Sequence, residues 1–224
     1  MNHAKPYIVI FVVLLIFVAS YFASKKFLTK IVGHIKSTYH SSELVQNQTL
    51  KDGDIIFNVQ KINHNDTSKL IFNHCGIIIH NNNNVFVFET GKNAQFVPLK
   101  KFIASGFNGH FLVKRLTNSD SVFSEVKLNK FRETIKMLRG KKNDMFFEWT
   151  DKNMYNAELV WKIYKQSTNI SLCEPVSISE LNLKSANAQY FLKNRFSDYI
   201  SPNEIVVTPN DIFNSILLYT VASN

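Results

Sequence analysis

The sequence predicts an α+β fold, in which a run of strands precedes a run of helices. Short apolar segments bounded by turn residues fill the stretch 54–116. Segments with helical periodicity, several of them with recognisable start or stop signals, fill the stretch after it. Because strands and helices are separated along the chain, we expect an antiparallel sheet packed against helices.

The strands are expected in the first half of the globular region. Asp-Gly at 52–53 marks a turn that opens the first strand. Four consecutive asparagines at 81–84 are expected to form the turn of a hairpin, since Asn tolerates positive φ. The polar stretch 61–69 is expected to be a loop. The expected strands are 54–59, 73–80, 85–90 and 110–116.

The helices are expected mainly in the second half. The helix 153–164 is predicted with Asn153 as its N-cap and with apolar residues at i, i+4 and i+8 from Tyr155. A further helix starts at Thr208-Pro-Asn-Asp211, with Thr at the N-cap, Pro at N1 and Asp at N3. The other expected helices are 99–105, 121–139 and 183–196.

Composition supports a folded domain and argues against a nucleic-acid-binding one. Apolar residues make up 45% of the 224 residues, enough for a sizeable core. The net charge is +9, but part of it lies in the first 30 residues and the rest forms no basic run or aromatic-interleaved patch. Two cysteines, far apart, imply no disulfide framework, and Cys75 is expected to be a small buried hydrophobe.

The N-terminus carries a hydrophobic segment. Tyr7 to Ala23 is a 17-residue run without charge, which as a helix would span roughly 25 Å. It could be a signal peptide with a small-residue site at Val18-Ala19-Ser20, but we expect an uncleaved signal or membrane anchor. Lysines flank it on both sides, so the side of the membrane stays open. The expected organisation is a signal or anchor segment 1–30, a linker 31–47 and one domain 48–224.

A histidine and a glutamate on neighbouring strands are candidates for chemistry. His74 shares a strand face with Gly76, whose missing side chain leaves room for a close approach, while Cys75 points to the opposite face. Glu89 on the next strand could hold the far nitrogen of the imidazole and fix its tautomer. Together with a helix N-terminus, which favours a thiolate, these residues form the skeleton of a thiol hydrolase.

The sequence resembles the permuted papain-like amidases of the YaeF/YiiX type, in the NlpC-type superfamily. The resemblance covers about residues 48–218. It implies a permuted papain-like fold, in which an antiparallel sheet or half-barrel packs against helices and the histidine precedes the nucleophile helix. It rests on the segments LKDGDIIF at 50–57, HCGIII at 74–79, VFE at 87–89, VPL at 97–99, FEW at 147–149, YNAELVWKIY at 155–164 and IVVTPNDIF at 205–213.

The resemblance implies a role for each matched position. The catalytic histidine of the family matches His74, and its orienting residue matches Glu89. The family nucleophile is a cysteine two residues before a glutamate, here Glu158, so that Asn156 stands at the nucleophile position. A carboxamide is a very poor nucleophile, and the thiol that a helix N-terminus would activate is missing. Gly76, Tyr155 and Glu158 are expected as supporting residues, Glu158 either through the site or through its helix dipole.

Two functions follow from this resemblance. The first is a thiol amidase or peptidase scaffold for amide or ester bonds, in peptide, peptidoglycan or lipid-linked substrates, that is silent as written. The second is a pseudoenzyme that binds an amide-containing ligand or a partner protein, where Asn156 offers both a donor and an acceptor. Neither Cys75, on the opposite strand face, nor Cys173, in an expected loop, is placed to replace the missing thiol.

The remaining polar and aromatic residues have simpler interpretations. No cofactor or metal is expected, because the other histidines show no metal-ligand spacing with one another. Asp52 and Asp54 are expected to form a turn, and Trp149 and Trp161 to be part of the core or of a cleft wall.

Overall fold

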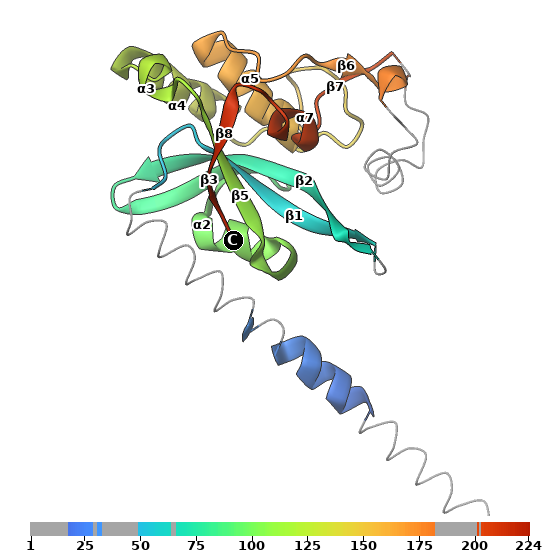
Figure 1. The fold of residues 1–224 in the computed structure, drawn as a ribbon. Coiled ribbons are helices and arrows are strands. Elements are labelled where there is room, and N and C mark those ends of the chain that lie inside the picture. The colour runs from blue at the N-terminus through green and yellow to red at the C-terminus, as the bar shows by residue number, and fades with distance from the viewer. Residues whose placement is uncertain (1–17, 29–30, 33–48, 64–65, 182–200, 202) are drawn as a thin grey trace, which may run out of the picture.

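The core of the fold is a six-stranded antiparallel sheet with helices on both faces (Figure 1). The computed structural model describes residues 18–28, 31–32, 49–63, 66–181, 201 and 203–224. The strand order is β4-β3-β2-β1-β5-β8. The strands are β1 Ile55–Asn63, β2 Asp66–Asn81, β3 Asn84–Thr90, β4 Ala94–Pro98, β5 Phe111–Leu116 and β8 Leu218–Ser223. A separate pair joins β6 Val176–Ser177 to β7 Ile205–Val206.

The prediction of a loop at 61–69 is wrong. β1 continues to Asn63 and β2 begins at Asp66, so the two strands form a long hairpin that projects from the body of the sheet (Figure 1). The pairing includes Lys61 with Leu70. Ladder hydrogen bonds join backbone groups and need no apolar side chains, so hydropathy did not reveal this extension. The predicted hairpin turn between β2 and β3 is confirmed, with Asn82 at φ 52°.

The long helix predicted at 121–139 is divided in two. The helices are α2 Leu99–Ser105, α3 Ser119–Val122, α4 Glu125–Leu138, α5 Asn156–Thr168 and α7 Pro209–Phe213, with short 3-10 turns at Phe107–Gly109 and Ile178–Glu180. The backbone leaves helical geometry at Phe123 and Ser124, and the Phe123 ring packs 5.1 Å from that of Phe131. Burial of this aromatic ring therefore overrides helical continuity. The predicted helix 183–196 lies outside the described residues.

The two helix starts behave differently. Thr208 caps α7 as predicted, its hydroxyl accepting from the Asp211 N–H at 3.2 Å. The predicted cap Asn153 is wrong, because α5 begins at Asn156 with Tyr155 as the extended N-cap residue. The Tyr155 N–H donates to the carboxylate of Glu158 at 3.4 Å, so a glutamate inside the helix supplies the cap.

The sheet is buried on both faces, and its alternation sets the position of the site. One face packs Phe57, Cys75 and Ile77 against α4 and α5, and the other packs Ile78 and Val87 against α2. Figure 1 shows α4, α5 and α7 on one side of the sheet and α2 on the other. Cys75 is fully buried, as predicted.

The N-terminal segment is only partly described. Residues 18–28 form a helix with exposed side chains, and the first part of the predicted hydrophobic run 7–23 lies outside the described residues. Within the described part of the chain, no helix combines the length and the apolar character needed to span a bilayer.

Candidate active site

The structure brings His74 and Glu89 into direct contact. The His74 Nε2 atom lies 2.6 Å from Oε2 of Glu89, on the neighbouring strand β3. The Glu89 side chain is nearly buried, with 8% exposed, whereas 25% of the His74 side chain remains exposed. Gln95 on β4 donates to the other oxygen of Glu89, Oε1, at 3.2 Å. The carboxylate is therefore held from both sides and fixes the edge of the imidazole that faces it.

Asn156, the first residue of α5, meets the opposite edge of the same imidazole. Its side-chain nitrogen Nδ2 lies 2.6 Å from His74 Nδ1 and 3.3 Å from the carbonyl oxygen of Asn73. The three predicted site residues thus form one chain of contacts, from Asn156 through His74 to Glu89.

These hydrogen bonds determine which nitrogen of the imidazole carries the proton. The amide nitrogen of Asn156 can only donate, and its second neighbour, a carbonyl oxygen, can only accept. Nδ1 of His74 must therefore accept, which places the proton on Nε2, where it is donated to Glu89. A neutral imidazole with its free electron pair toward the helix start is the form that a general base requires.

Gly76 is what allows the two strands to carry these groups so close together. A Cβ atom at this position would lie 2.9 Å from the Phe88 carbonyl oxygen and 3.1 Å from Cβ of Glu89. The missing side chain of Gly76 therefore does allow a close approach beside His74, and strand β3 is the element that makes this approach. On the α2 side, the Phe102 ring lies 5.6 Å from the imidazole, so the ring of His74 packs against an apolar wall.

Two buried residues hold the start of α5. The hydroxyl of Tyr155 accepts from the Val207 N–H at 3.0 Å. Glu158 is fully buried and pairs with the Lys162 ammonium at 2.7 Å, one turn further along the helix. Burial raises the pKa of Glu158 to about 7, although the Lys162 ammonium opposes the rise. Lys162 in turn bonds the Thr150 carbonyl oxygen and the Asp151 carboxylate, at 3.0 and 2.8 Å.

Comparison with known proteins identifies the family. Residues 49–222 match the YaeF/YiiX family of permuted papain-like amidase enzymes. The chain belongs to this family. It is 33% identical, over 174 residues, to the uncharacterized protein YiiX of Escherichia coli (strain K12), covering 76% of this chain and 85% of that protein. It is also similar to the crystal structure of the metalloprotein yiiX from Escherichia coli O157:H7, with a TM-score of 0.67 and 30% identity, over 79% of this chain and 98% of that one.

Neither cysteine of this family member is placed at the site. Cys75 lies on the opposite face of β2 from His74, in the core cluster with α5, and burial raises the pKa of its thiol far above the usual range. Cys173 follows α5, and burial raises its pKa to about 12. Both thiols therefore stay protonated at neutral pH.

The two aspartates of the predicted turn anchor strands. Asp52 accepts from the His80 N–H and binds Arg132 of α4 at 2.7 Å, and Asp54 binds Arg115 of β5 through two 2.7 Å contacts. His80 Nδ1 lies 2.7 Å from the same Asp52 carboxylate.

Sequence reasoning missed two contributors to the site, Gln95 and Lys162. Gln95 follows the turn after β3, and Lys162 lies at i+4 from Glu158. The i, i+4 spacing of Glu158 and Lys162 was the available signal for the second contact, because such pairs face each other on a helix.

Proposed function

We propose that this chain is a thiol-amidase scaffold of the permuted papain-like type, with His74 as general base, Glu89 as its orienting group and position 156 in the place of the nucleophile. The observation that carries the proposal is the chain of two 2.6 Å contacts through the His74 imidazole. In a thiol amidase, the base takes the proton of the thiol, and the thiolate attacks the carbonyl carbon. The imidazolium returns the proton to the departing nitrogen, so that an amine leaves and a thioester forms, and water then hydrolyses the thioester to an acid and the free thiol.

With asparagine at position 156, the site is proposed to be catalytically inactive. The Asn156 amide donates to Nδ1 of His74. It thereby occupies the electron pair of Nδ1 that would otherwise accept the thiol proton. A carboxamide forms no comparable anion, so the attacking group is missing while the base and its orienting carboxylate remain paired.

The family description supports an amide-containing substrate, and cell-wall peptides or lipid-linked acyl groups are the proposed classes. The proposed organisation keeps a signal or anchor segment at 1–30, a linker at 31–47 and the domain at 48–224, with the membrane approached through residues 7–23. Esters are proposed as alternative substrates, since a thiolate attacks both kinds of carbonyl.

A metal ion is not part of the proposed mechanism. One relative is described as a metalloprotein. In the portion of this chain that the structure describes, no three His, Cys, Asp or Glu side chains come together in a group that could hold a metal. The described donors therefore do not fit such a site, and no step is assigned to a metal.

One observation favours a second candidate function, a binding module for an amide-containing ligand. Because Nδ2 of Asn156 faces His74 and the Asn73 carbonyl, the amide oxygen Oδ1 is directed away from these two groups. That oxygen is an acceptor for the N–H of a ligand amide.

The substitution Asn156→Cys separates the two functions. If the scaffold is intact, the restored thiol is expected to react with an acyl ester probe and to release its leaving group. The double substitution Asn156→Cys and His74→Ala should react at least about 100-fold more slowly than Asn156→Cys alone, since a general base contributes at least that factor. The unmodified protein supplies the background, which should be low because both native thiols have raised pKa values.

Two results would overturn the amidase proposal. One is a folded Asn156→Cys protein that does not react with the probe. The other is equal reactivity with and without His74, which would show that the thiol reacts without the base. In either case an unreactive amide ligand that binds the Asn156 protein would support the binding module instead.

A further inference from the structure

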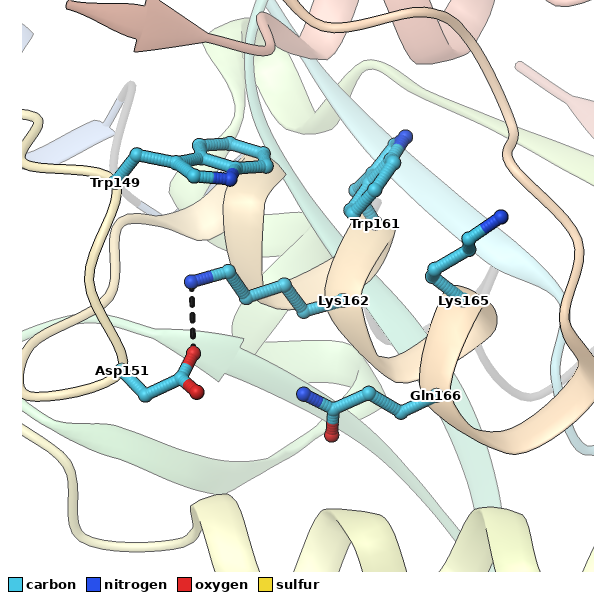
Figure 2. Close-up of a pocket in the computed structure, with 6 residues that line it drawn as sticks. All are labelled: Trp149, Asp151, Trp161, Lys162, Lys165 and Gln166. Carbon is cyan, nitrogen blue, oxygen red and sulfur yellow. Dashed lines mark hydrogen bonds and ion pairs between the residues drawn. The ribbon is translucent and has the colours of Figure 1, made fainter.

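A pocket on the exposed side of α5 has no role in the proposed chemistry. We call it the α5 pocket; its volume is about 340 Å³, which falls in the range of small-ligand sites. Lys162, in its wall, lies six residues after Asn156, about 9 Å along the helix axis. The pocket is lined by Trp149, Asp151, Trp161, Lys162, Lys165 and Gln166 (Figure 2).

Two fixed indole rings form the apolar wall of the α5 pocket. The Trp149 and Trp161 rings lie 5.4 Å apart at an angle of 61°. Trp161 is held by its ring N–H, which donates to the Cys173 carbonyl at 2.8 Å, and Trp149 lies over the Lys162 ammonium at 5.0 Å. Since both rings are already held, a ligand that packs on them would not have to order them first.

The two lysines of the pocket differ in what remains for a ligand. The Lys162 side chain is only 9% exposed, and its ammonium is surrounded by the Thr150 carbonyl and the carboxylates of Asp151 and Glu158. Lys165 instead donates to the Ser171 hydroxyl at 3.1 Å, and no carboxylate among the described residues lies within 4.0 Å of its ammonium. The charge of Lys165 is therefore the one left for a ligand.

Polar groups of opposite character stand on the two sides of the pocket. In Figure 2 the Asp151 carboxylate lies on the side of Trp149, and the Lys165 ammonium lies beyond Trp161, on the other side. In this view the Gln166 amide points toward the side of Asp151. The Asp151 carboxylate is already paired with the Lys162 ammonium at 2.8 Å, whereas Lys165 has no carboxylate partner among the described residues, so an anionic group of a ligand is attracted to the Lys165 side.

We propose that the α5 pocket binds a ligand with a ring-shaped face and an anionic substituent, the ring against the indoles of Trp149 and Trp161 and the anion on Lys165. Gln166 provides a donor and an acceptor for polar groups at the edge of the ring. A sugar phosphate and an aromatic phosphate share this chemistry, because both pack a flat face on an indole and carry a charge that an ammonium attracts. The site is independent of amidase chemistry and needs no thiol at position 156.

Trp149 and Trp161 are the only two tryptophans of the chain, so tryptophan fluorescence, excited at a wavelength that the eight tyrosines do not absorb, reports on the pocket. The full chain is titrated with glucose 6-phosphate and with phenyl phosphate. Glucose and phenol serve as the separate ring halves, and inorganic phosphate serves as the separate anionic half. A saturable change with at least one of the two ring phosphates is expected, with at least tenfold weaker binding of the corresponding halves.

The substitution Lys165→Gln removes the proposed anion partner. It is expected to weaken binding of the ring phosphate about tenfold or more, as expected for the loss of one charge-assisted hydrogen bond. Lys136→Gln is the matched control, because it removes the same charge from an exposed position on α4 and should leave the affinity unchanged. A urea titration of both variants shows that each is folded.

Each contrary result identifies a specific error. Inorganic phosphate binding as tightly as the ring phosphates would mean that only a general attraction of anions exists. Glucose or phenol binding as tightly as its own phosphate would remove the role of Lys165. No saturable change below about 10 mM ligand, or equal losses in Lys165→Gln and Lys136→Gln, would overturn the proposal.

Discussion

The buried carboxyl of Glu158 predicts that the stability of this protein increases as the pH falls from neutral. The perturbation is Glu158→Gln, which keeps an oxygen that can accept from the Tyr155 N–H and removes the charge. Lys162 keeps the Asp151 carboxylate and the Thr150 carbonyl as partners. The variant therefore isolates the ionisation of Glu158 and preserves the cap of α5.

The expected magnitude follows from the pKa. Burial raises the pKa of Glu158 from 4.5 to about 7, so the folded state binds the proton more tightly than the unfolded chain does. Stability is therefore gained as the pH falls through about 7, and the gain is complete below about 4.5. Between about pH 8 and about pH 5.5 the contribution is about 2 kcal/mol.

Lys162 does not titrate in this range. Burial lowers its pKa, but hydrogen bonds to Asp151 and Glu158 outweigh burial and raise the pKa above its usual value of 10.5. The ammonium stays charged on both sides of the transition, so the pH dependence belongs to the carboxyl.

Urea denaturation at three pH values between about 5.5 and 8 measures the effect. The unfolding free energy of the unmodified protein should rise toward low pH by about 2 kcal/mol more than that of Glu158→Gln. Glu125→Gln, at an exposed position in the first turn of α4, is the control and should keep the full pH dependence. Identical pH profiles for the unmodified protein and Glu158→Gln would refute the reasoning.

Two further substitutions test the packing around the site. Gly76→Ala should lower the unfolding free energy by about 1–3 kcal/mol, because the new Cβ meets the backbone of β3 at 2.9 Å; an unchanged melting temperature would contradict the close approach. Tyr155→Phe should lower it by about 1–3 kcal/mol, since the Val207 N–H loses its acceptor in a buried position. Urea denaturation measures the second effect, and a loss well below 1 kcal/mol would show that the N–H finds another partner.

Much of the sheet could be predicted because its strands are short apolar runs bounded by turn residues. The hairpin of β2 and β3 was predicted by apolar runs around four asparagines, and the structure confirms it. The polar arm of β1 and β2 was missed, because its ladder is made by backbone groups that leave no hydropathy signal. The break at Phe123 was missed for a different reason, since tertiary packing of one ring overrode local helical preference.

The site was predictable in its members but not in its contacts. His74 and Glu89 were predicted from strand alternation, and Asn156 from the family resemblance, and the structure places all three in one chain. Their catalytic roles remain predictions. The N-cap of α5 was mispredicted because Asn153 is a favourable capping residue by type, whereas the buried Glu158 supplies the cap in the folded helix.

The separation of the site residues along the chain has a consequence for folding. His74 and Asn156 are 82 residues apart, and the sheet strands β1 to β3 are all synthesised before α5. The contact between them forms only after a long loop has closed, which is the kind of event that slows folding. During synthesis His74 and Glu89 are present before Asn156, so the distance between positions 74 and 156 reports on the docking of α5 against the sheet.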